Sequence, residues 1–224
     1  MEIRYFQKGF NYSEDGTGNR LVIHLQGCNL HCPWCSNPEG MTFTGGEKAS
    51  IEELAEEIIS SKRLFFDGGG VTFSGGECTV QKEALKALFP LLKKQGINIA
   101  VETNGTLPYE EDFFENIDLL IADCKHYDEE KLSERVGQVR GYRENIANYL
   151  RFHHNLLICI PLIASFNAET DKKEVAYFIE QVTGHLIPDF KGAIKHGVNA
   201  LQKELLDKAE KEENPKKKDN FRHV

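Results

Sequence analysis

Short apolar runs alternate with longer amphipathic segments between residues 21 and 190. The runs have the length and composition of strands, and they predict strands at Leu21–Gln26, Val71–Ser74, Ile97–Glu102, Ile117–Cys124 and Leu156–Ile163, with a weaker one at His185–Ile187. Apolar residues at helical spacing predict helices at residues 51–62, Gln81–Gln95, Tyr142–Phe152 and Asp171–Val182. Ser50 and Glu53 have the spacing of a capping box, which predicts that the first helix begins at Ile51.

Strands that alternate with helices predict a parallel sheet with right-handed crossovers. Six such units are too few for a closed eight-stranded barrel, so we expect an α/β fold, an open partial (β/α)6 barrel, over residues 1–190. Residues 1–20 are interpreted as an entry segment that ends in a Gly-rich turn, and residues 191–224 as a charged C-terminal helix and tail. In barrels of this kind, functional residues gather at the carboxyl ends of the strands.

Charge and hydropathy narrow the class of protein. The 35 acidic residues outnumber the 27 basic ones and give a formal net charge of −8, which argues against a broad nucleic-acid-binding surface. No apolar run reaches the roughly 18 residues of a membrane span, and the first ten residues lack the apolar segment of an export signal. We therefore expect a cytoplasmic protein with reduced thiols and neither nucleic-acid nor membrane partners.

Three closely spaced cysteines follow the first predicted strand. Cys28, Cys32 and Cys35 have C-x3-C-x2-C spacing, and a short loop of this kind supplies converging thiolates for a [4Fe–4S] cluster. Three ligands leave one iron open to another molecule. A structural zinc site usually has four ligands in two separated pairs, so here zinc would need His31 or a distant residue. A disulfide with one spare thiol is the third alternative, although the chain is not a short cysteine-dense secreted domain.

The cysteines, together with Trp34 directly before the third one, resemble the cluster loop of the radical S-adenosylmethionine superfamily. DGTGNR at residues 15–20 resembles the DGPGxR segment of one branch, the glycyl-radical-enzyme activating enzymes, and SNPE at residues 36–39 resembles the motif after their third cysteine. The resemblance is strong over residues 1–125, thinner to about 190 and absent from the tail. No cysteine-rich insert separates Cys35 from Gly75, which is similar to the single-cluster subgroup that includes the activators of pyruvate formate-lyase.

Three further motifs follow predicted strands and are candidate cofactor contacts. The resemblance implies that Gly75, Gly76 and Glu77 contact the amino group of S-adenosylmethionine, where glycines permit a close approach of the backbone. It also implies that Glu102, Thr103 and Asn104 contact the cofactor's ribose or a monovalent cation. Asp123 and Lys125 are two positions apart at a strand end, so their side chains point to the same face. The resemblance implies that they contact the cofactor and the same cation.

The resemblance implies a mechanism and two kinds of protein partner. A flavodoxin or ferredoxin reduces the cluster, which splits S-adenosylmethionine homolytically, and the 5′-deoxyadenosyl radical takes a hydrogen atom from a glycine of a partner glycyl radical enzyme. Two alternatives remain: a radical enzyme that acts directly on a small molecule or peptide, and a non-catalytic iron–sulfur protein. Cys78 stands where the family usually has Pro, and Cys159 where it often has Arg. The histidine-bearing segment that the family has near the end of the domain is missing. We interpret Cys78, Cys124 and Cys159 as buried small hydrophobes.

Overall fold

A computed structural model describes residues 1–126, 128–161, 163 and 166–167. The chain divides into two compact units. The first consists of Met1–Asp123 and Asp128–Cys159, and the second of Cys124–Tyr127 and Ile160–Val224. The helix predicted at residues 171–182, the strand predicted at 185–187 and the boundary predicted at residue 190 lie outside the described residues.

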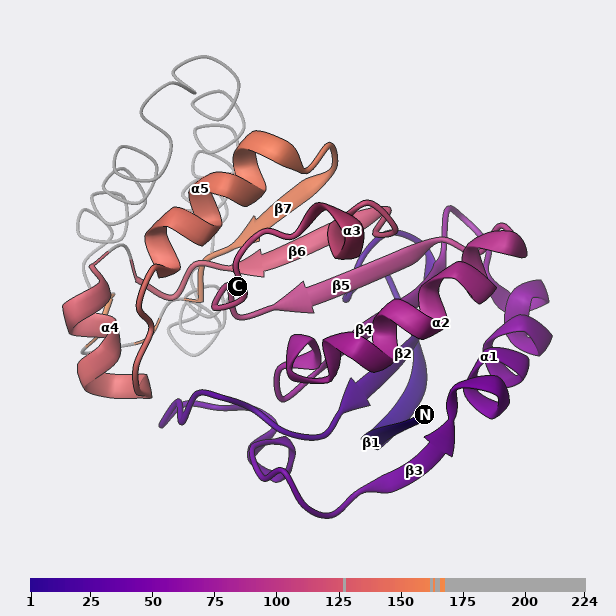
Figure 1. Cartoon of the computed structure of the whole chain (residues 1–224), viewed down its shortest axis with the longest axis horizontal. Coiled ribbons are helices and arrows are strands. Elements are labelled where there is room, and N and C mark those ends of the chain that lie inside the picture. The colour runs from indigo at the N-terminus through magenta and orange to yellow at the C-terminus, as the bar shows by residue number, and fades with distance from the viewer. Residues whose placement is uncertain (127, 162, 164–165, 168–224) are drawn as a thin grey trace, which may run out of the picture. The chain divides into compact units, whose positions relative to one another are not determined.

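A seven-stranded open sheet in the order β3-β1-β2-β4-β5-β6-β7 forms the core of the first unit (Figure 1). Five neighbouring strands are parallel, namely β2 (Asn19–Leu25), β4 (Gly70–Gly75), β5 (Ile99–Thr103), β6 (Leu119–Asp123) and β7 (Leu156–Cys159). At the other edge, β1 (Glu2–Tyr12) pairs antiparallel with β2, and β3 (Glu47–Ser50) pairs antiparallel with β1. This mixed α/β fold with a mostly parallel open sheet confirms the predicted class.

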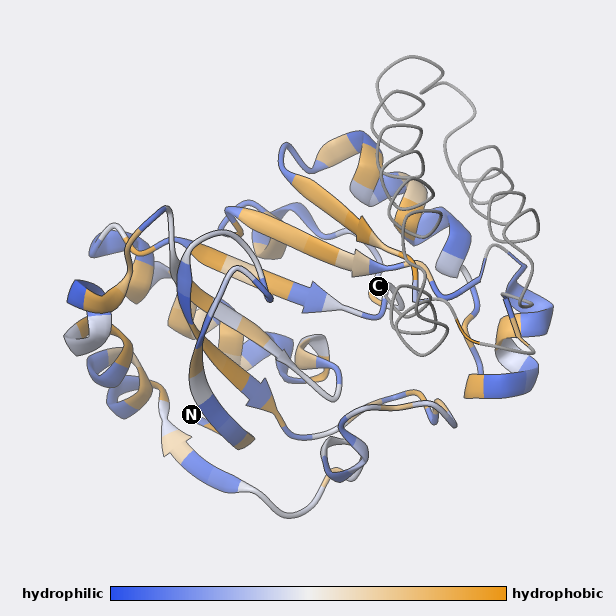
Figure 2. Cartoon of the chain, turned by 180° about the vertical axis from the view of Figure 1, so that it is seen from behind, coloured by the Kyte–Doolittle hydropathy of each residue, from blue (hydrophilic) through white to orange (hydrophobic). Residues whose placement is uncertain are grey.

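Helices connect the parallel strands, as the alternating pattern predicts. They are α1 (Ile51–Ser60), α2 (Lys82–Lys94), α3 (Glu111–Phe114), α4 (Glu129–Val136) and α5 (Tyr142–Phe152), with 3-10 turns η1 (Pro38–Gly40), η2 (Ser61–Leu64) and η3 (Cys78–Gln81). The capping box is confirmed, because the Ser50 hydroxyl accepts from the Glu53 N–H and the Glu53 carboxylate accepts from the Ser50 N–H. On β4, Phe73 packs against Phe89 of α2 with ring centroids 5.5 Å apart. The strands β5 to β7 are mainly hydrophobic along their length (Figure 2).

The described elements match the predicted ones closely, except that three elements, β1, β3 and α4, were not predicted. The five stronger predicted strands and the helices at α1, α2 and α5 are present, although β7 ends at Cys159, before the predicted end at Ile163. The predicted entry segment contains the 11-residue strand β1, which the sequence analysis missed. It also missed α4, whose sequence EEKLSERV has only two buried apolar residues, Leu132 and Val136.

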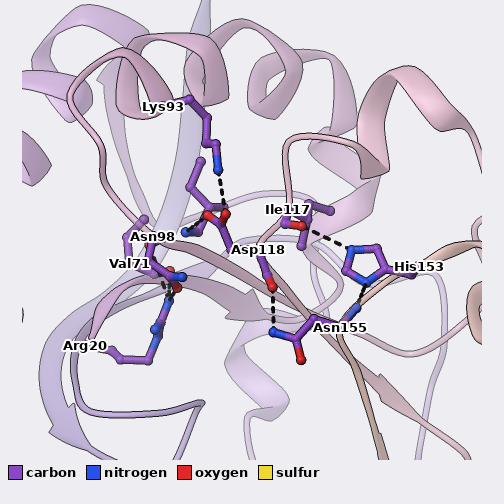
Figure 3. A network of polar contacts seen from close by, with 9 residues as sticks. Arg20, Val71, Lys93, Asn98, Ile117, Asp118, His153 and Asn155 are labelled. Carbon is purple, nitrogen blue, oxygen red and sulfur yellow. Dashed lines mark hydrogen bonds and ion pairs between the residues drawn. The ribbon is translucent and has the colours of Figure 1, made fainter. Parts of the chain in front are cut away.

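A polar network joins the amino ends of the parallel strands (Figure 3). The Arg20 side chain is 1% exposed and donates to the Val71 carbonyl (2.7 Å) and to Asn98 Oδ1 (3.0 Å). Next to it, Asp118 Oδ2 accepts from the Ile99 N–H (2.8 Å), and the Asp118 carbonyl accepts from Asn155 Nδ2 (2.7 Å). Burial lowers the pKa of Arg20 to about 10.

The DGTGNR segment therefore has a structural place. Residues 13–18 connect β1 to β2 as a hairpin, and Arg20 lies at the start of β2, one strand length away from the cysteines. Gly18 has φ +75°, and a Cβ there would lie 2.5 Å from the backbone of Phe66, Asp67 and Gly69. The turn belongs to the amino-end network, because the Asp15 carbonyl accepts from the Thr72 hydroxyl (2.7 Å).

Candidate functional site

The three cysteines occupy an irregular loop after β2, at the carboxyl-end rim of the parallel strands. Cys28 is buried at 9% exposure, whereas Cys32 and Cys35 are half-buried, and the Cys35 N–H donates to the Cys32 carbonyl (3.1 Å). Cys28 and Cys35 carry unbridged thiols, which excludes a disulfide among the three. In the described part of the chain, no three His, Cys, Asp or Glu side chains are arranged to hold a metal ion.

The surroundings of Cys28 fit an iron–sulfur ligand. Its sulfur lies 3.4 Å from the Leu30 N–H and 3.9 Å from Asn104 Nδ2, and such hydrogen bonds to sulfur stabilise a thiolate at a cluster. Burial raises the pKa of the Cys28 thiol to about 11. A thiol must lose its proton to bind a metal, so the site by itself favours the neutral thiol, and the thiolate needs the positive charge of bound iron. Three thiols on one loop are the donor type that a cluster needs, and in this structure they are not gathered around one metal position.

Gly75 and Gly76 allow the end of β4 to pass directly against the cysteine loop. A Cβ on Gly76 would lie 2.4 Å from the carbonyl oxygens of Gly27 and Gly40, which flank the three cysteines. Gly75 has φ +120°, and a Cβ there would lie 2.3 Å from the Leu25 nitrogen. Any side chain would push these segments apart. The glycines thus serve internal packing, and their contact with S-adenosylmethionine stays a prediction.

Glu77 links the rim residues of β4 and β5. Its side chain is 1% exposed, and one oxygen accepts from Thr103 Oγ1 (2.8 Å) and Thr79 Oγ1 (2.5 Å). The other oxygen accepts from the Asn104 N–H (2.6 Å). Burial raises the pKa of the Glu77 carboxyl, and these hydrogen bonds oppose that effect. The carboxyl group is therefore directed at the Glu102–Asn104 segment, which it holds in place.

Asn104 connects the β5 rim to the cysteine loop. Its Nδ2 donates to Asn29 Oδ1 (2.9 Å), and its Oδ1 accepts from Thr106 Oγ1 (2.7 Å). Asn29 Nδ2 in turn donates to Thr106 Oγ1 (2.7 Å). Asn29 and Thr106 were not among the predicted site residues. Their signal in the sequence is that Asn29 lies inside the cysteine loop and Thr106 directly follows the Asn104-Gly105 turn. Two of the predicted motifs are thus brought together by side-chain contacts.

The remaining predicted residues are distributed along the same rim and beyond it. Glu102 is half-buried and accepts from Ser74 Oγ of β4 (2.5 Å). Asp123 ends β6, and its carbonyl accepts from the Tyr142 hydroxyl (2.6 Å). Lys125 belongs to the second compact unit, so its pairing with Asp123 stays a prediction. Trp34 is half-buried in the cysteine loop.

Cys78 and Cys124 match their predicted role as buried small hydrophobes, and the prediction is wrong for Cys159. Cys78 and Cys124 are 0% exposed, and the Cys78 thiol donates to the Glu102 carbonyl (3.3 Å). Cys159 is half-buried at the end of β7.

No helix in the described part of the chain is long and apolar enough to span a membrane.

Comparisons with known proteins identify the family and several relatives of the chain. Residues 22–173 match the family model of the Radical SAM superfamily. The chain is 41% identical over 169 residues to a pyruvate formate-lyase-activating enzyme of Clostridium pasteurianum, covering 71% of this chain and 67% of that protein. It is 33% identical over 141 residues to the pyruvate formate-lyase 1-activating enzyme of Escherichia coli K12, covering 61% and 57%. The chain thus spans between 57% and 67% of the lengths of these relatives.

A solved structure supports the fold alone. TYW1 with a lysine-pyruvate adduct bound aligns with a TM-score of 0.50 at 18% identity, covering 73% of this chain and 61% of that one.

The match to the Radical SAM family model implies a [4Fe–4S] cluster and S-adenosylmethionine as cofactors. Since that match covers more than half of the chain, the protein belongs to the radical S-adenosylmethionine superfamily.

Proposed function

We propose that the protein is an activase that uses S-adenosylmethionine to abstract a hydrogen atom from a glycine of a partner glycyl radical enzyme. The single observation that carries the proposal is the direct linkage of the motifs at one rim: Asn104 contacts the cysteine loop, and Glu77 holds Asn104. The relatives named as activating enzymes supply the substrate class. A flavodoxin or ferredoxin is the proposed electron donor.

In this proposal Cys28, Cys32 and Cys35 would hold the cluster through their three thiolates. When bound, the cluster supplies the electron that cleaves S-adenosylmethionine and so drives the hydrogen abstraction. The proposed cofactor contacts are Trp34, Gly75, Gly76, Glu77, Glu102, Thr103, Asn104, Asp123 and Lys125. The side-chain oxygen atoms of Glu102, Thr103, Asn104 and Asp123 also suit a monovalent cation.

The chain's own residues have the tasks of placement and exclusion. The buried Glu77 carboxyl fixes the Thr103 hydroxyl and the Asn104 backbone, so the β5 rim is preorganised before the cofactor arrives. The Asn104 side chain then fixes the loop at Asn29. A segment of the partner protein has to bring a glycine Cα to this rim. Other groups that could give a hydrogen atom to the radical have to be kept away from it.

Anaerobic reconstitution tests the proposal. The chain is loaded with iron and sulfide, reduced with dithionite and mixed with S-adenosylmethionine, with or without candidate glycyl radical enzymes. We expect 5′-deoxyadenosine in each wild-type sample and a glycyl doublet in the paramagnetic resonance spectrum of the true partner. Cys35→Ala is the matched control and should give neither signal.

Other outcomes separate the competing functions. Cleavage of S-adenosylmethionine with turnover of a small molecule or peptide, and no glycyl doublet with any candidate, would favour the direct radical enzyme. A bound cluster that leaves S-adenosylmethionine intact under strong reductant would identify a non-catalytic iron–sulfur protein. Zinc retained in the cysteine loop in place of iron would contradict the activase and both of these alternatives.

A further inference from the structure

Gln26 is a buried amide at the base of the cysteine loop, and neither the motifs nor the family match assigns it a role. It follows β2 directly and is 4% exposed. Its Nε2 donates to the carbonyls of Glu39 (2.8 Å) and Thr42 (2.7 Å), which lie on the return arm of the loop beyond the third cysteine. The side chain therefore spans the base of the loop from its entry arm to its return arm.

Backbone pairing closes the loop at the same place. The Gly27 N–H donates to the Gly40 carbonyl (2.9 Å), and the Cys28 N–H donates to the Met41 carbonyl (3.2 Å). All three cysteines lie between Gly27 and Gly40. Closing the base removes conformations in which the two arms separate, so the loop that carries the sulfurs is restricted at its base before any ligand is present.

A second glutamine, Gln81, connects this base to Arg4 of β1. It ends η3, four residues after Glu77, and its Nε2 donates to the carbonyls of Gln26 (2.9 Å) and Arg4 (2.6 Å). Its Oε1 accepts from the Arg4 N–H (2.8 Å). The Arg4 carbonyl also accepts from the Gln26 N–H (2.9 Å). Gln26 and Gln81 together form a continuous brace from β1 through β2 to the return arm.

We infer that Gln26 and Gln81, the glutamine brace, are positioning residues that hold the cysteine loop in the shape that receives the cluster and S-adenosylmethionine. Neither side chain carries a cluster ligand, and both act through backbone groups. The inference deepens the proposed function and rests on its cluster site, but not on the identity of the radical's substrate.

The chemistry of the side chains explains why amides are needed. The carbonyls of Glu39 and Thr42 need a donor at Gln26, because a buried carbonyl without one is destabilising. Gln81 needs both a donor and an acceptor, since it serves the carbonyl and the N–H of Arg4. Glutamate has nearly the same shape but lacks the donors, and its negative charge would face carbonyl oxygens.

Isosteric variants test the brace. We expect Gln26→Glu to lose its reconstituted cluster to an iron chelator about tenfold faster than wild type, and Gln81→Glu about threefold faster, because each removes hydrogen bonds that hold the loop. The matched control is Gln95→Glu, an exposed glutamine at the end of α2, which should behave as wild type. Iron and sulfide content, chelator kinetics and apoprotein melting are measured for each variant.

A second readout separates loop positioning from general stability. Addition of S-adenosylmethionine to the reduced cluster should shift the wild-type paramagnetic resonance spectrum, and Gln26→Glu should need several-fold more S-adenosylmethionine for the same shift. The double variant should lose its cluster no faster than about the Gln26→Glu single variant, since the two residues act in one chain of contacts.

Defined results would overturn the inference. They are wild-type chelator kinetics and titration in Gln26→Glu, strictly multiplicative effects in the double variant, or equal effects in Gln95→Glu. If Gln26→Glu does not fold, the Gln81→Glu variant decides, because it retains the acceptor for Arg4. None of these measurements uses a glycyl radical enzyme, so failure of the proposed substrate class leaves the test intact.

Discussion

The two ends of the parallel strands carry polar networks of opposite character. At the amino ends, Arg20 and Asp118 are matched to carbonyl and N–H groups of neighbouring strands, and this network joins parts of the fold to one another. At the carboxyl ends, Glu77 and Asn104 also have protein partners, but those partners lead to a loop of three thiols. Thiols are weak hydrogen-bonding groups, so this loop gains little from the fold unless a metal centre is bound.

This difference indicates how the molecule separates stability from function. A buried guanidinium that satisfies several carbonyls stabilises the fold without any ligand. The cysteine loop instead depends on surrounding contacts for its shape, and it is stabilised by metal–thiolate bonds only when the cluster is bound. Substitutions at the two ends should therefore separate cleanly into losses of stability and losses of cofactor chemistry.

The largest expected effect is at the cysteine loop. Cys32→Ala and Cys35→Ala should each abolish cleavage of S-adenosylmethionine, because a cluster with an open iron needs all three ligands. Both residues are half-buried, so unfolding of the apoprotein should change by less than about 1 kcal/mol. Product formation and chemical denaturation are measured on the same preparations. Cys159→Ala, also half-buried, should retain activity, and comparable loss in that variant would contradict the assignment.

The next largest effect is at the opposite end. Arg20→Met keeps the apolar stem but leaves the Val71 carbonyl, the Thr72 hydroxyl and Asn98 Oδ1 without their donor. We expect a loss of about 3 kcal/mol in the free energy of unfolding. The cluster content and cleavage rate per folded molecule should remain those of wild type. A folded variant with normal stability and impaired cleavage would break the distinction between the two ends.

Local sequence patterns predicted most of the sheet but not its antiparallel edge. Strands such as β5 (Ile99–Thr103) are apolar runs that lie between helices, and their pattern is sufficient. β1 has partly exposed faces and contains polar residues such as Gln7, Lys8 and Asn11, so its sequence does not stand out from a loop. Its pairing with β2 is a tertiary effect.

The site was predictable where spacing along the chain carries the chemistry, as in Cys28, Cys32 and Cys35. The contact of Glu77 with Thr103 and Asn104 depends on β4–β5 register, in which Phe73 pairs with Val101, and spacing does not contain that information. The same applies to Gln26, whose partners Glu39 and Thr42 lie 13 and 16 residues away. Buried polar side chains that satisfy distant backbone groups are invisible to local patterns.

A smaller effect is expected at Glu77, which shares features of both ends. In Glu77→Gln, one carboxylate oxygen becomes an NH2 group that faces the N–H of Asn104 or the hydroxyls of Thr79 and Thr103. We expect a loss of about 1–3 kcal/mol in stability. Because Asn104 is displaced, the KM for S-adenosylmethionine should also rise. A stability loss with an unchanged KM would place Glu77 with the amino-end network.

The smallest expected effect is a pH dependence at the amino ends, and it comes from His153. This side chain is 7% exposed, its Nδ1 accepts from the Asn155 N–H (3.2 Å), and burial lowers its pKa below the ordinary 6.5. Between 6.5 and the lower folded pKa, the unfolded chain binds more protons than the folded one, so stability is complete above pH 6.5 and falls as the pH decreases. Replacing His153 by Gln should remove this part of the stability profile, measured by denaturation between pH 5 and pH 8 on the apoprotein. His154→Gln is the neighbouring control, and an equal loss of pH dependence there would contradict the assignment to His153.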